Sequence, residues 1–164
     1  LIMLQLAKLS GAANIIAVEP IEEKKKQALE LGADIALDPK ADNISEVLKK
    51  YGLEQVDVVI ECVGRPETIE QAISLAGKYS TVMMFGLTKP DAEISVKPFE
   101  IFKKEIKLKS NYINPYTFSA AIKLIESGKI DVSSMVYKKE PLTELPDILS
   151  DGKRRSAGKY IITM

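Results

Sequence analysis

The sequence predicts an α/β protein in which helices cover both faces of a parallel sheet. Two observations support this fold class. Apolar runs that are too short for helices alternate with longer segments whose apolar residues recur at helical spacing. Several of the short runs are almost continuously apolar, which is typical of strands covered on both faces by crossover helices. We expect these crossovers to be right-handed.

The first predicted element is a helix over residues 1–10 (LIMLQLAKLS), because its apolar residues share one face and Gly11 follows as a stop. The run NIIAVE (14–19) is rich in β-branched residues and too short for a helix, so it predicts a strand. This strand ends in Glu19, an acid at the point where the chain leaves the core. Either a ligand or the start of the next helix could explain an acid at this position.

The next helix is predicted to start at Pro20, since proline suits the first helical position. The acidic side chains of Glu22 and Glu23 would interact favourably with the positive N-terminal end of this helix. Gly32 is well placed for a left-handed C-cap. The short run DIALD (34–38) predicts the second strand.

Two further strand–helix pairs are predicted. Residues 43–52 (NISEVLKKYG) favour a helix that is opened by an Asn43 cap and closed by a glycine. Residues 56–64 (VDVVIECVG) predict a buried strand, 65–77 a helix that ends in a glycine, and 79–87 (YSTVMMFGL) another buried strand.

The pattern changes after this fourth strand. A polar loop leads to a short helix near 99–104, and the alternating apolar residues of 105–112 favour a strand at a sheet edge. Residues 114–130 (NPYTFSAAIKLIESGKI) predict an amphipathic helix that is ended by Gly128. The tail holds one helix, a charged loop and a final strand over 159–164, and we expect it to form a separate piece.

The composition excludes several classes of function. A length of 164 residues is enough for one domain with a core but too short for two full-sized ones. Basic and acidic residues number 23 each, so no net charge would attract nucleic acid or an anionic membrane. No apolar run is long enough to span a membrane, and no signal peptide is recognisable. We therefore expect neither nucleic acid nor a membrane as a partner.

The side chains also restrict the chemistry. The chain has no histidine, and Cys62 is its single cysteine. The usual zinc and copper ligand sets, and catalytic arrangements that depend on histidine, cannot be assembled within it. We predict no metal site and no catalytic residue in this chain. The single cysteine fits a reducing cytoplasm.

Three segments resemble the medium-chain dehydrogenase/reductase family, in particular its zinc-dependent alcohol, polyol, butanediol and threonine dehydrogenases. They are residues 4–34 (LQLAKLSGAANIIAVEPIEEKKKQALELGAD), 57–87 (DVVIECVGRPETIEQAISLAGKYSTVMMFGL) and 158–163 (GKYIIT). The resemblance implies a Rossmann-type domain over 1–134 that binds NAD, and a tail over 135–164 that returns to a catalytic domain outside this chain. In that family the catalytic domain holds the zinc that polarises an alcohol, and hydride passes to the nicotinamide.

The resemblance also implies that the first strand and its G-x-G-x-x-G turn would lie just before Leu1. No two of the nine glycines have the spacing of that motif. In the expected strand order 3-2-1-4-5-6 the first strand is central, so without it the second and fourth strands would have unpaired apolar edges. We expect either a longer chain, a re-pairing of the two halves or a strand from a partner to complete the sheet. The isolated chain is expected to be inactive.

Glu19 is the first candidate for contacting the cofactor. An acid after the second strand of such a domain can accept hydrogen bonds from the adenosine ribose hydroxyls and repel a 2′-phosphate, which favours NAD over NADP. Alternatively, the charge of Glu19 only stabilises the positive N-terminal end of the following helix. Lys24 matches a basic position that flanks the adenosine in the family, but a run of three lysines is equally consistent with a solvated helix face.

The next candidates end the strand over 56–64. The carboxyl ends of parallel strands border the ligand crevice in such sheets, and the resemblance places Cys62, Val63 and Gly64 beside the cofactor. Gly64 would permit close approach of the backbone. The side chain of Cys62 is expected to be a small buried residue. Glu61 also matches an acid of the family, but the sequence suggests no role for it.

The last candidates end the two following strands. By the same resemblance, the backbone of Phe85, Gly86 and Leu87 would lie along the nicotinamide and bind its carboxamide, although an ordinary strand exit is the alternative. Ser110 and Asn111 match a second segment on the nicotinamide side. The polyol dehydrogenases often have an arginine where Asn111 stands, which weakens that match.

The resemblance implies a small alcohol or polyol as substrate and a homo-oligomer formed through the edge strand over 106–110. Two other functions stay open at this point. One is a stand-alone nucleotide-binding or regulatory module. The other is an S-adenosylmethionine-dependent methyltransferase, which also has an acid after its second strand but needs a glycine motif before its first helix.

Overall fold

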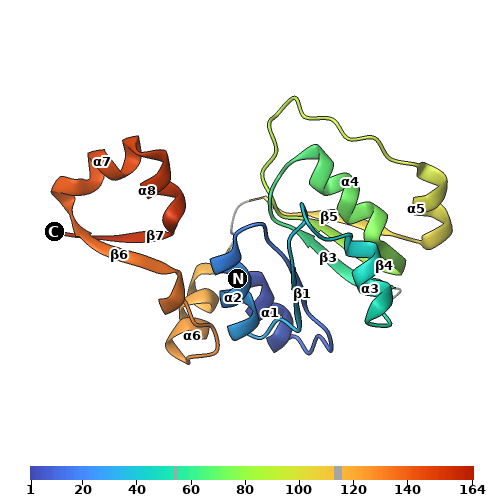
Figure 1. The fold of residues 1–164 in the computed structure, drawn as a ribbon, viewed down its shortest axis with the longest axis horizontal. Coiled ribbons are helices and arrows are strands. Elements are labelled where there is room, and N and C mark those ends of the chain that lie inside the picture. The colour runs from blue at the N-terminus through green and yellow to red at the C-terminus, as the bar shows by residue number, and fades with distance from the viewer. Residues whose placement is uncertain (54, 113–115) are drawn as a thin grey trace. The chain divides into compact units, whose positions relative to one another are not determined.

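The computed structural model describes residues 1–53, 55–112 and 116–164. These residues form two compact units, one made of 1–36 with 116–164 and the other lying within 37–115. Helices alternate with strands along both units (Figure 1). The described strands make three sheets, with the orders β1-β2, β3-β4-β5 and β6-β7, and every pairing within the last two sheets is parallel. The predicted α/β fold class is confirmed.

The elements of the first unit, together with β2 at its border, are α1 (Ile2–Leu9), β1 (Ile16–Val18), α2 (Glu22–Glu30), β2 (Ile35–Leu37), α6 (Phe118–Glu126), η1 (Ser133–Met135), β6 (Val136–Pro141), η2 (Leu142–Glu144), α7 (Leu145–Ser150), α8 (Gly152–Ala157) and β7 (Lys159–Thr163). Those of the second unit are α3 (Ile44–Lys50), β3 (Val56–Glu61), α4 (Pro66–Leu75), β4 (Ala76–Met84), α5 (Pro98–Lys104) and β5 (Lys107–Ser110).

The N-terminal helices of the first unit pack on β1 through small and branched side chains. Leu4, Ile15, Ala28 and Ala33 form the buried cluster. The buried Gln5 exchanges two hydrogen bonds with the main chain of Asp131, its amide donating to the carbonyl over 2.8 Å and its oxygen accepting from the N–H over 2.7 Å. This exchange ties α1 to the segment that follows α6.

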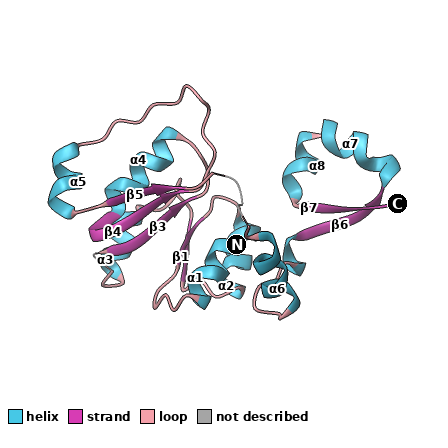
Figure 2. Cartoon of the chain, turned by 180° about the vertical axis from the view of Figure 1, so that it is seen from behind, coloured by secondary structure: helices cyan, strands magenta, loops and turns pink. Residues whose placement is uncertain are grey.

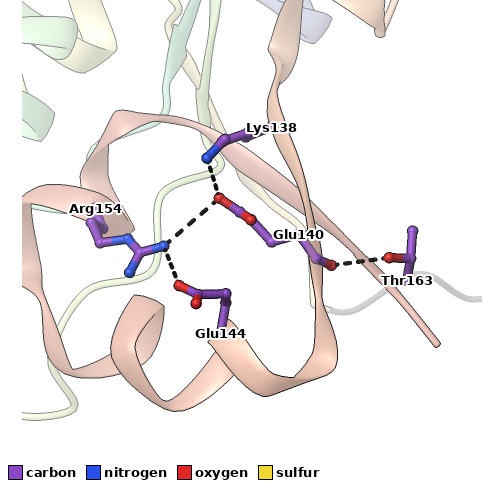
Figure 3. Close-up of polar contacts among 5 residues, drawn as sticks. All are labelled: Lys138, Glu140, Glu144, Arg154 and Thr163. Atoms are coloured by element: carbon purple, nitrogen blue, oxygen red, sulfur yellow. Dashed lines mark hydrogen bonds and ion pairs between the residues drawn. The ribbon is translucent and has the colours of Figure 1, made fainter.

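The tail is a parallel strand–helix–strand segment of its own, with α7 and α8 connecting β6 to β7. Charged side chains join its parts (Figure 3). The buried Glu140 on β6 binds Lys138 and lies 3.8 Å from the guanidinium of Arg154, which also binds Glu144 over 3.2 Å. The hydrogen bond to Glu140 raises the pKa of Lys138. The hydroxyl of Thr163 donates to the Glu140 carbonyl over 3.3 Å, so the same residue also holds β7.

The sheet of the second unit has β4 at its centre and β3 and β5 at its edges, with α4 and α5 packed against it (Figure 2). The core lies between this sheet and the two helices, where Ala72, Ala76, Val82 and Ile106 are buried. Val82 is fully buried in the central strand. The predicted edge position of the strand over 105–112 is confirmed, because β5 pairs only with β4 among the described strands.

Several local predictions are confirmed by the backbone. The Asn43 side chain accepts a hydrogen bond from the N–H of Glu46 and caps α3. Gly32, Gly52 and Gly128 follow their helices with φ values of +105°, +70° and +68°, which is the left-handed region that glycine tolerates best.

The start of α2 is not where the sequence predicted it. The helix begins at Glu22, and Ile21 is its N-cap with an extended backbone. The Glu19 carboxylate accepts a hydrogen bond from the N–H of Ile21 over 3.0 Å. Residues 19–21 therefore form a turn, and Pro20 lies in this turn rather than at the first helical position.

The strand over 56–64 is shorter and more exposed than predicted. It ends at Glu61, and Val58 is 58% exposed. β3 is an edge strand, so it has a neighbouring strand on one side only among the described residues. Val18 of β1 is 44% exposed in its two-stranded sheet as well. The expected re-pairing of the two halves is not observed in the described strands.

Two further boundaries differ from the prediction. Helix α4 ends at Leu75 and runs directly into β4, so Gly77 lies in a strand, where a Cβ would come within 3.0 Å of the Gln55 side chain. In the tail, the predicted charged loop is helix α8, because the Asp151 side chain caps the N–H groups of Lys153 and Arg154. Strand β6 was not predicted.

Candidate functional site

A buried carboxylate lies at the carboxyl end of β3. Glu61 is only 5% exposed, and the N–H groups of Val63 and Gly64 donate to its oxygens over 2.7 to 3.1 Å. The hydroxyl of Thr68, in the first turn of α4, lies 2.9 Å from both the same carboxylate and the Arg65 carbonyl, and these two acceptors share its single proton. Hydrogen bonds to an ionised acceptor are shorter and stronger than neutral ones. Glu61 therefore fixes the turn 62–64 and joins it to the start of the next helix.

The main chain of the same residue holds the end of β4. The Glu61 carbonyl accepts hydrogen bonds from the N–H groups of Phe85, over 2.9 Å, and Gly86, over 2.8 Å. One residue thus binds the turn 62–64 through its side chain and the segment 85–87 through its backbone.

The two glycines let these segments meet backbone to backbone. A Cβ at Gly64 would lie 2.3 Å from the Leu87 carbonyl oxygen, and a Cβ at Gly86 would lie 2.2 Å from the nitrogen of Gly64. Both distances are far below van der Waals contact, so a larger residue would separate the segments. Gly64 also has a φ of +77°, which L side chains rarely adopt.

The candidate residues of the second unit gather at one edge of its sheet. The register pairs Glu61 with Met84 and Met84 with Ser110, so the carboxyl ends of β3, β4 and β5 are level. The side chains beyond these ends are exposed, and they are Cys62, Val63, Phe85, Leu87, Ser110 and Asn111. The carboxyl edge of a parallel sheet is where ligands of such folds bind.

The expected burial of Cys62 is wrong, because the residue is exposed. The chain turns away from the sheet directly after Glu61, which leaves the thiol outside the core. Partial burial by the surrounding turn still raises the pKa of the Cys62 thiol, and the neighbouring Glu61 carboxylate raises it further.

Glu19 and Lys24 belong to the first unit. Glu19 is half-buried, and its Oε1 accepts the Ile21 N–H before α2, which is the structural role that the sequence left open as an alternative. Among the described residues none donates a hydrogen bond to its second oxygen, Oε2. Lys24 is half-buried in the first turn of α2, next to Lys25, which pairs with Glu22 over 2.8 Å.

The role of Glu61 was missed by sequence reasoning. A signal was present, because an acid within an almost apolar strand is rarely buried without hydrogen-bond donors to satisfy it. Those donors are main-chain N–H groups and a threonine seven residues further on, and the sequence pattern does not identify them because the path of the turn brings them to the carboxylate.

Other kinds of site find no support in the described part of the chain. No group of three or more Cys, Asp or Glu side chains there could hold a metal ion. None of the helices in that part is both long and apolar enough to cross a bilayer. A hollow of about 440 Å³ beside Ile130 and Ser133 is lined by none of the predicted site residues.

Comparison with known families gives one match over most of the chain. The family described as zinc-binding dehydrogenase matches residues 1–127. The erythritol/L-threitol dehydrogenase of Mycolicibacterium smegmatis is 27% identical over 157 residues, which are 92% of this chain and 42% of that protein. The (R,R)-butanediol dehydrogenase of Bacillus subtilis strain 168 is 31% identical over 99% of this chain and 47% of its own length.

Solved structures agree with this match. A protein from Sinorhizobium meliloti 1021, described as a zinc-binding dehydrogenase bound to NADP, superposes with a TM-score of 0.91 at 32% identity, over 98% of this chain and 48% of that one. The chain thus spans about half the length of the proteins that it matches.

Proposed function

The chain belongs to the zinc-binding dehydrogenase family, and we propose that it is the NAD-binding portion of an alcohol or polyol dehydrogenase. The observation that carries this proposal is the pair of interlocked glycine segments, 62–64 and 85–87, at the carboxyl edge of a parallel sheet. A flat cofactor ring can approach a backbone closely only where no Cβ intervenes. The family match does not favour the methyltransferase alternative.

Contacts to the dinucleotide are proposed for each unit separately. In the second unit, the backbone of residues 62–64 and 85–87 would bind the nicotinamide side, and Ser110 and Asn111 would extend that surface. In the first unit, Glu19 would accept hydrogen bonds from the adenosine ribose, with Lys24 beside the adenosine. Oε2 of Glu19 accepts no hydrogen bond from the residues that the structure describes, and this supports the role, since one oxygen can hold the turn while the other binds a hydroxyl.

The preference between the two nicotinamide cofactors is a separate proposal. The solved relative from Sinorhizobium meliloti is bound to NADP. A carboxylate at Glu19 would repel a 2′-phosphate, and this supports NAD as the cofactor here. Lys24 and Lys25 are the groups that could weaken the preference if they reached a 2′-phosphate.

The remaining parts of the reaction are proposed to lie outside residues 1–164. The bound nicotinamide supplies the hydride acceptor when an alcohol is oxidised. The chain has no histidine and one cysteine, so zinc and the groups that bind the substrate would belong to the catalytic domain, to which residues 135–164 would return after the cofactor domain over 1–134. Polyol and butanediol substrates are suggested by the relatives' names.

Assembly through β5 is proposed on the exposure of its edge. All four residues of β5 are exposed, and an unpaired edge can bind the same strand of a second copy. A cytoplasmic location stays a prediction that rests on the single cysteine.

Cofactor titration tests the proposed function. We expect NADH to bind the chain with a change in its fluorescence, and NADPH to bind more weakly. Glu19→Gln should remove most of the difference between the two, because it removes the charge that repels the 2′-phosphate. Glu23→Gln, at an exposed glutamate in the first turn of α2, is the matched control and should keep the difference. The absence of NADH binding at millimolar concentration would refute the proposal.

A further inference from the structure

The Glu61 carboxylate is buried and fully engaged, although the proposed function does not use it. Its partners are the N–H groups of Val63 and Gly64 and the hydroxyl of Thr68, and its carbonyl binds the N–H groups of Phe85 and Gly86. Every one of these partners is a donor. The three donors to the carboxylate converge on Oε1, and within the described part of the chain Oε2 receives only the longer branch from the Gly64 N–H, at 3.1 Å. A carboxylate accepts at both oxygens, whereas a glutamine would accept at one and carry a donor at the other.

The direction of these bonds decides what the turn presents to a ligand. The described peptide bonds are all trans, so each C=O points opposite to the N–H of the same peptide group. The N–H groups of Val63 and Gly64 point at the Glu61 carboxylate, and the carbonyls of Cys62 and Val63 consequently point away from it. In the same way, the N–H of Gly86 points at the Glu61 carbonyl and the Phe85 carbonyl points away. Carbonyl oxygens facing outward would accept hydrogen bonds from N–H or O–H groups of a ligand.

We propose that Glu61 is a positioning residue for the nicotinamide half of the cofactor, because it sets the orientation of the peptide groups in the turn 62–64 and their distance from the segment 85–87. This inference rests on the proposed function. Glu61 itself is buried beneath the turn and acts through the backbone that it holds. An amide could keep its oxygen in the place of Oε1, but its N–H₂ group would then face the Gly64 N–H from the place of Oε2, where the carboxylate accepts from that nitrogen over 3.1 Å, and the peptide group of Gly64 would have to turn.

A comparison of two ligands separates positioning from general support of the fold. NADH carries the nicotinamide, whereas ADP-ribose has the adenosine half without it. Glu61→Gln should raise the Kd of NADH at least tenfold and change the Kd of ADP-ribose by less than twofold. Glu67→Gln, at an exposed glutamate in the first turn of α4, should leave both unchanged.

Thr68 supplies a second variant in case Glu61→Gln does not fold. Thr68→Val removes one of the donors to Glu61 and should weaken NADH binding selectively but by a smaller factor. Thr68→Ser, which restores the hydroxyl, should restore the affinity. A parallel loss of affinity for both ligands, together with a lower Tm, would assign Glu61 to the fold alone and overturn the inference. Unchanged NADH affinity in Glu61→Gln would overturn it too.

The unsubstituted chain is titrated first, so that the two proposals can fail separately. Failure of that chain to bind NADH contradicts the proposed function and removes the basis of this inference. Binding that none of the Glu61 and Thr68 variants alters contradicts the inference alone.

Discussion

At the scale of single residues, the path of the chain decides whether a side chain is buried more than the type of residue does. Glu61 and Cys62 are neighbours, yet the carboxylate is buried and the thiol is exposed. This is the reverse of what polarity suggests. The carboxylate can be buried because main-chain N–H groups and the Thr68 hydroxyl replace its water.

The exposed thiol allows a prediction about reactivity. Since the thiolate is the nucleophile, a raised pKa means that less of Cys62 is reactive at a given pH. Alkylation by iodoacetamide should therefore be slow at pH 7 to 8 and should rise at a higher pH than in the urea-unfolded chain. Mass spectrometry follows the rate without ambiguity, because the chain has one cysteine. A folded chain that reacts at lower pH than the unfolded one would contradict the prediction.

At the scale of secondary-structure elements, two valines of neighbouring strands differ in solvent exposure, and the sequence did not indicate this difference. Both VDVVIE and TVMM are apolar runs that predicted buried strands. Val82 in the central β4 is fully buried, whereas Val58 in the edge strand β3 is 58% exposed. The difference arises because Val82 and its partner Val59 lie on the sheet face that packs against α4 and α5, whereas Val58 is paired with Thr81 and lies on the opposite face.

This difference can be measured as a change in the free energy of unfolding. Val82→Ala should lower it by about 2 kcal/mol, since two methyl groups are lost from a packed core. Val58→Ala is the matched control, and its effect should stay within about 0.5 kcal/mol. Urea unfolding followed by circular dichroism compares the two. Equal losses in both variants would mean that the β3 side chain is covered in solution.

The elements themselves were largely predictable. The helix over 1–10, the Asn43 cap and the glycines after three helices correspond to α1, α3 and their ends. The errors lie where a carboxylate binds main-chain N–H groups two or three residues further on and so shifts or starts a helix. The Glu19 carboxylate displaces the start of α2, and the Asp151 cap turns an expected loop into α8.

At the scale of the whole molecule, the chain carries the contacts proposed for a cofactor but no group that we assign to catalysis. Its family match covers residues 1–127, and it spans about half the length of its relatives. The lack of histidine and the single cysteine restrict the chemistry that its side chains can perform. Cofactor binding and turnover are therefore expected to be separable properties.

An activity assay checks this separation. The chain of residues 1–164, supplied with NAD⁺, zinc and butane-2,3-diol, should bind the cofactor and produce no NADH above background. The reason is that no histidine and only one cysteine are available to hold a catalytic zinc. Turnover near the usual enzyme rate of about 10 s⁻¹ would contradict this expectation.

The sequence by itself determined the alternation of helices and strands, the exclusion of histidine-based chemistry and the positions of Glu19, Gly64 and Gly86 at strand ends. These are local properties, since periodicity, composition and turn residues are visible along the chain. Only the tertiary structure decided that Gly64 and Gly86 interlock, that Glu61 holds both of their segments and that Val58 is exposed. Those outcomes depend on which strands pair and in which register, and the register brings together residues more than twenty positions apart.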